Sequence, residues 1–137
     1  QEIRHALFDH EGIKRQVAAH VGAVVNEVPH DEDLFGQGLV GEEFFGIRGQ
    51  VTRAAISVPS NVAEGWSRES RREKAQFFAI AQGSLSELHT QLLLCERLGW
   101  MAAESLQRAY RLIDEVSRML TVLRRTLRAP SGETGRR

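Results

Sequence analysis

The sequence has little of several features that would place it in a narrow class. A single cysteine, Cys95, among 137 residues excludes an internal disulfide framework and any cysteine-rich zinc site. No apolar run approaches the roughly 20 residues that a membrane-spanning helix needs, so we expect no membrane contact. The scarcity of cysteine favours the cytoplasm as the compartment. The only prolines are Pro29, Pro59 and Pro130, and the long stretches between them favour helices.

Two motifs of familiar enzyme chemistry are also absent. The sequence has neither a Gly-x-x-x-x-Gly-Lys-Ser/Thr phosphate-binding loop nor a nucleophile elbow. Two Glu-x-x-His pairs, Glu2–His5 and Glu27–His30, have the spacing of di-metal sites in helix bundles, but such a site needs two further inward glutamates. We therefore predict a protein that is not an enzyme and holds no metal or cofactor.

The formal net charge of zero hides an asymmetry along the chain. Residues 1–47 carry three basic and nine acidic side chains, a charge of −6, whereas residues 48–137 carry fifteen and nine, a charge of +6. The last twenty residues hold six arginines and one acid, Glu133. A basic end of this kind can bind nucleic acid, but runs of charge are more often a solvated helix face followed by a frayed tail.

The second half of the chain predicts two long helices, because its apolar residues step by three and four. In the first helix, between Ser70 and Gly99, these residues are Phe78, Ala81, Leu85, Leu88, Leu92 and Cys95. In the second they are Leu106, Ala109, Ile113, Val116, Leu120, Leu123 and Leu127. Ser70 and Glu73 form a capping box, Gly99 suits a left-handed stop, and the short link predicts antiparallel packing.

The first half predicts two more helices, over residues 13–28 and 44–65. The first stops at Pro29. The second contains Pro59, which removes one backbone hydrogen bond and predicts a kink, where the Ser57 hydroxyl would bond a freed carbonyl.

The four helices together predict an all-α fold, an antiparallel up-down four-helix bundle. Residues 1–128 would form its single domain, with a glycine-rich acidic loop at 29–46. Residues 129–137 would be a disordered basic tail.

A polar pattern inside the second and third predicted helices resembles a known family. It begins at Gln50 and continues with Arg53-Ala54-Ala55, Ser57, Pro59, Asn61, Ala63 and Glu64-Gly65. It continues in the next helix with Phe77-Phe78, Ala81, Gly83-Ser84-Leu85-Ser86-Glu87-Leu88, Gln91-Leu92 and Leu98-Gly99-Trp100. Over residues 43–128 the chain resembles the four-helix-bundle family of 23S rRNA intervening-sequence proteins, also labelled S23 ribosomal proteins.

The resemblance implies a homopentameric ring. The accessory proteins of diversity-generating retroelements share the fold, and they bind a reverse transcriptase and nucleic acid. This chain departs from that branch because residues before 43 match poorly and its net charge is zero rather than basic. The expected function is an oligomeric, non-enzymatic scaffold or adaptor that binds itself and RNA, DNA or a reverse transcriptase.

Two alternatives remain open at this point. One is a purely structural oligomer with a protein partner at the acidic first quarter. The other is a DNA-binding regulator, because residues 53–78 can be read as helix-turn-helix with the turn at Gly65.

Two sets of residues are candidate sites. The proposed nucleic-acid-binding set lies on the last helix and comprises Arg108, Arg111, Arg118, Arg124, Arg125 and Arg128. Arg111, Arg118 and Arg125 are seven apart and about 140° from the apolar stripe, so they would face outward. The structural set is the family motif Ser57, Pro59, Asn61, Glu64 and Gly65. It would fix the turn between two helices, with Glu64 paired to Arg53, Arg68 or the helix start near Ser70.

Apolar residues outside the two long stripes predict self-association. These are Phe77, Ile80, Tyr110, Met119 and Val122. A monomer would expose part of this set, and exposed apolar patches usually mark interfaces.

Overall fold

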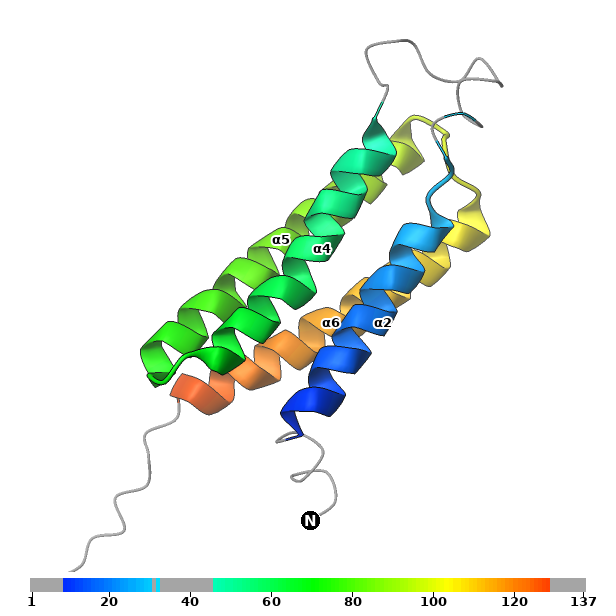
Figure 1. Ribbon diagram of the computed structural model, residues 1–137. Helices are drawn as coiled ribbons and strands as arrows, with labels where there is room; N and C mark the ends of the chain where they lie inside the picture. Colours follow the sequence, from blue (N-terminus) through cyan, green and yellow to red (C-terminus); the bar gives the residue numbers. More distant parts are fainter. Residues whose placement is uncertain (1–8, 31, 33–45, 129–137) are drawn as a thin grey trace, which may run out of the picture.

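The computed structural model describes residues 9–30, 32 and 46–128, and this part of the chain forms four α-helices and no strand. In chain order they are α2 (His10–Glu27), α4 (Ile47–Ser67), α5 (Arg71–Arg97) and α6 (Ala103–Arg128). α2 packs against α4 and α6, and α5 packs against the same two helices. Successive helices run in opposite directions (Figure 1), which confirms the predicted all-α bundle. The expected basic tail and most of the 29–46 loop lie outside the described residues.

The predicted ends of α5 are confirmed by its capping bonds. The Ser70 side chain accepts a hydrogen bond from the Glu73 backbone N–H at 3.1 Å, as a capping box requires. At the other end Gly99 has a φ of 72°, a left-handed conformation that favours glycine. The chain then turns through Trp100, whose backbone N–H donates to the Cys95 carbonyl at 2.9 Å.

The link between α5 and α6, residues 99–102, contains no serine, threonine, aspartate or asparagine that could cap the start of α6. In the structure, Trp100 and Met101 are buried in the core, and the helix begins two residues later at Ala103. The burial of these two large side chains therefore holds the link in place and sets where α6 begins. A search of the sequence for capping residues does not detect this kind of anchor.

The predicted end of the second helix at Gly65 is wrong. α4 continues through Pro59 and Gly65 to Ser67, and the turn lies at residues 68–70. Gly65 is buried inside the helix, where an added Cβ would lie 2.8 Å from Phe78 Cε1. The glycine therefore permits close packing of α4 on α5, and the turn that the helix-turn-helix interpretation placed at Gly65 lies at residues 68–70 instead.

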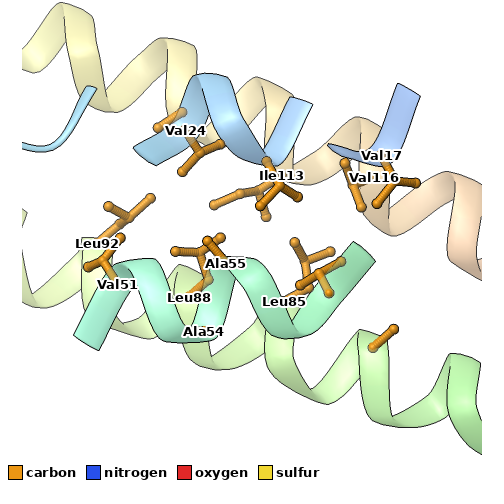
Figure 2. Close-up of a cluster of buried hydrophobic side chains, with 14 of the residues drawn as sticks. Val17, Val24, Val51, Ala54, Ala55, Leu85, Leu88, Leu92, Ile113 and Val116 are labelled. Atoms are coloured by element: carbon orange, nitrogen blue, oxygen red, sulfur yellow. The ribbon is translucent and has the colours of Figure 1, made fainter. Parts of the chain in front are cut away.

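The four helices share one apolar core, and none of the described polar or charged residues is buried in it. Side chains from all four point toward the bundle axis (Figure 2), and those labelled are Val17, Val24, Val51, Ala54, Ala55, Leu85, Leu88, Leu92, Ile113 and Val116. All the predicted stripe positions of α5, and those of α6 up to Leu123, are buried. Burial of such residues is the main source of bundle stability.

None of the helices in the described part of the chain has the length and hydropathy needed to cross a lipid bilayer.

Candidate nucleic-acid interface

α6 presents one face to the core and carries arginines on the other. Arg111, Arg118 and Arg125 are all exposed, and they follow one another every two helical turns. The buried residues of α6 lie on the opposite side. The structure therefore leaves these three guanidinium groups on a single outward strip.

Arg108 belongs to the same helix but is held in an ion pair with α2. Its Nε and Nη2 atoms donate to Glu27 Oε1 and Oε2 at 2.9 and 3.0 Å, a bidentate geometry. The hydrogen bond from Arg108 is the main cause that lowers the pKa of Glu27, and a hydrogen bond from Ser105 adds to it. The hydrogen bond to Glu27 in turn raises the pKa of Arg108. Arg108 therefore ties α6 to α2, and its charge is already neutralised.

Arg124, another of the six arginines predicted to bind nucleic acid, points toward α5 rather than outward. Its Nη1 donates to Gln82 Oε1 at 2.7 Å, and the Gln82 amide donates in turn to Thr121 Oγ1 at 3.3 Å. The Arg124 side chain is half-buried in this contact. It is a link between helices rather than part of the outward strip.

Arg118 is paired but accessible. Its Nη2 lies 2.5 Å from Asp114 Oδ2 one turn earlier, and the Arg118 side chain is 78% exposed. Exposed pairs of this kind contribute little to stability, so a phosphate can compete with Asp114 for the guanidinium. Arg111, Arg125 and Arg128 form no ion pair within the described residues.

The family motif lies on the contact between α4 and α5. Asn61 Nδ2 donates to the Ser57 carbonyl at 2.7 Å and to Ser57 Oγ at 3.0 Å. Ser57 Oγ lies 2.7 Å from Ser84 Oγ on α5, so this hydroxyl bridges two helices rather than bonding a carbonyl freed by Pro59. The expectation for Ser57 was wrong because the neighbouring helix supplies a nearer partner.

Glu64 pairs with Arg68, one of the three expected partners. The Arg68 guanidinium also lies over the Phe77 ring, with its Cζ atom 4.8 Å from the ring centroid. The charge of Glu64 near the helix C-terminus is thereby balanced, and the pair packs onto the first turns of α5. Together these contacts lock α4 to α5 next to the turn.

Replacement of Asn61 with alanine should lower the free energy of unfolding by about 1–3 kcal/mol, because half-buried groups of Ser57 lose their donor. Ser60→Ala is the matched control, since the exposed Ser60 makes a similar bond to the Ile56 carbonyl and should change stability little. Urea denaturation of both variants measures the difference. Unchanged stability of Asn61→Ala together with loss of partner binding would show that the motif is a binding site.

Other chemical groups in the described structure do not form a site. Burial raises the pKa of the Cys95 thiol to about 11, which keeps it protonated in the core. Glu27, from one of the Glu-x-x-His pairs, is engaged by Arg108, and the other pair lies outside the described residues. A shallow pocket of about 100 Å³ opens between α5 and α6. It is smaller than the roughly 300–1,000 Å³ of typical ligand pockets.

The geometry thus defines an up-down four-helix bundle with an arginine-bearing outer face. The family model described as 23S rRNA-intervening sequence protein matches residues 35–122, more than half of the chain. The chain therefore belongs to the 23S rRNA-intervening sequence protein family. No curated protein matches the sequence significantly.

Proposed function

We propose that this chain is a non-enzymatic, oligomeric scaffold that holds nucleic acid on the outer face of α6. The observation that carries the proposal is the outward strip formed by Arg111, Arg118 and Arg125 on the side opposite the core. Arginine guanidinium groups match phosphate oxygens in charge and in bidentate geometry. Contacts of this kind position a phosphate backbone and read little sequence.

Membership of a family named for an rRNA intervening sequence supports an RNA ligand. The resemblance to retroelement accessory proteins supports the narrower proposal that the nucleic acid is presented to a reverse transcriptase. A repeated outward strip in a ring of subunits would strengthen weak phosphate contacts by multivalency.

Self-association is the second part of the proposal, and exposed apolar side chains support it. Among the residues expected outside the core stripes, Ile80 is 46% exposed and Val122 is 38% exposed. Phe77, Tyr110 and Met119 are half-buried. Ile56, at 59%, is an exposed apolar side chain on α4 that the stripe analysis missed. We propose a homopentamer that covers part of this surface.

Charge reversal on the outward strip should weaken nucleic-acid binding at least tenfold at low salt. The change is Arg111→Glu, Arg118→Glu and Arg125→Glu together, which replaces three phosphate contacts with three repulsive charges. The measurement is fluorescence anisotropy of a labelled single-stranded oligonucleotide at low and physiological salt. Equal binding by wild type and variant, or binding by neither, would contradict the proposal and favour a scaffold whose partner is a protein.

A further inference from the structure

Arginines from two helices meet at one end of the bundle, where α5 begins and α6 ends. Arg71 Nη2 donates to the Thr126 carbonyl at 2.7 Å and so fixes the first turn of α5 against the last turns of α6. The first turn of α5 and the last turn of α6 lie at the same end of the bundle (Figure 1). Arg71 and Arg72 belong to the first of these turns, and Arg125 and Arg128 to the second. We refer to these four exposed residues as the end cluster.

The ends of α4, α5 and α6 place a positive charge around the end cluster. Residues 64–74 and 122–128 carry seven lysines and arginines and three glutamates, a formal charge of +4. Two of those glutamates are engaged: Glu64 pairs with Arg68, and Glu73 accepts a bond from Ser70 Oγ at 2.9 Å. Within the described residues, Arg72, Arg125 and Arg128 have no ion-pair partner.

The middle of the same outer face is electrically neutral. Residues 104–118 of α6 carry Arg108, Arg111 and Arg118 against Glu104, Asp114 and Glu115. Arg108 and Arg118 are held by Glu27 and Asp114, as described above. The attraction for an anion is therefore concentrated at the end of the bundle and weakens along α6.

The Arg72 side chain makes no hydrogen bond or ion pair that would stabilise the described fold. It lies in the first turn of α5, where the helix dipole makes positive charge unfavourable. Arg125 and Arg128 lie in the last turn of α6, where positive charge is favourable. Arg72 is exposed, and nothing in the described structure bonds its side chain, so its charge is available to a partner.

We propose that the end cluster is the principal phosphate contact, and that a nucleic-acid strand enters there and continues along α6 toward Arg118 and Arg111. This inference rests on the proposed function and narrows it to one part of the outer face. The partner chemistry is a phosphodiester backbone, because several arginine forks on two adjacent helices suit a chain of regularly repeated anions. An acidic protein segment is the competing partner.

Two double variants with equal charge change test the inference. The end variant is Arg72→Glu with Arg128→Glu, and the shaft variant is Arg111→Glu with Arg118→Glu. Each lowers the formal charge by four per chain, so a difference between them reports position rather than net charge. The readout is anisotropy of labelled single-stranded RNA at low salt, with an unlabelled polyglutamate peptide as a second probe.

We expect the end variant to lose about tenfold or more in RNA affinity and the shaft variant to lose about threefold or less. Equal losses, or a larger loss in the shaft variant, would overturn the inference and leave the proposed function standing. Absence of RNA binding by the wild type would overturn both. Displacement of the RNA by polyglutamate at equal charge concentration would assign the end cluster to an acidic protein instead.

Folding of the end variant can be checked independently. Its thermal midpoint should stay close to that of the wild type, because the helix dipole favours the glutamate at position 72 in the first turn of α5 and disfavours the glutamate at position 128 in the last turn of α6. If the glutamates disturb the fold, the neutral pair Arg72→Gln and Arg128→Gln should still weaken RNA binding, and unchanged binding by that folded pair would overturn the inference.

Discussion

Size-exclusion chromatography coupled to light scattering should return a mass of about 77 kDa, five times the 15.4-kDa chain, at micromolar concentration. The physical reason is the apolar surface that a single bundle leaves in water. Among the described residues, Ile56 and Ile80 are the most exposed large apolar side chains, and Leu93, Leu94 and Leu98 add to them on α5. Burial of such side chains between copies removes this surface from water.

Variants on α5 link the expected mass to this surface. Ile80→Glu combined with Leu94→Glu places charges on the exposed apolar residues and should shift the mass toward 15.4 kDa. Gln76→Glu, at an exposed polar position one turn before Ile80, is the control and should leave the mass unchanged. A wild-type mass near 15.4 kDa would contradict the proposed assembly.

Alanine at Gly65 and alanine at Gly83 should change stability in opposite directions. At Gly65 the new methyl would lie 2.8 Å from Phe78 Cε1 and 3.1 Å from Phe77 Cβ, and the Phe78 side chain is fully buried. The resulting overpacking exceeds the gain in helix propensity, so we expect a net loss of about 2 kcal/mol. At Gly83, in the middle of α5, nothing lies within 4 Å of the added Cβ. Alanine there should gain about 1 kcal/mol.

Urea unfolding of the two variants measures a difference of about 3 kcal/mol on this account. Both substitutions make the same chemical change inside a helix, so propensity cancels in the comparison. A Gly65→Ala variant as stable as Gly83→Ala would show that α4 and α5 are not in close contact at this position.

The sequence predicted the long helices well because their stability depends on a periodic apolar stripe. From Phe78 to Cys95 every stripe residue is buried, and the capping box and the left-handed Gly99 define the two ends. Gly65 was misread for a related reason. A glycine near a helix end resembles a stop signal, and only the position of Phe78 on α5 shows that it serves helix packing.

The arginine set could be predicted only in part. The exposure of Arg111, Arg118 and Arg125 follows from helix geometry, and the pairing of Arg118 with Asp114 could have been read from their spacing of four. The pairing of Arg108 with Glu27 could not, because 81 positions separate the two residues and the bundle brings them together. The same holds for Arg71 and Arg72, which lie beside the end of α6 only through the antiparallel packing of α5.

Binding through arginine contacts to phosphate has a characteristic dependence on salt, because each neutralised phosphate releases counterions. The measurement is the affinity of the wild-type protein for a labelled single-stranded oligonucleotide across a series of salt concentrations. About three phosphates neutralised per subunit predict a log–log slope of roughly −2 for each engaged subunit. A slope near zero, or no binding at low salt, would contradict nucleic-acid binding by the outer face of α6.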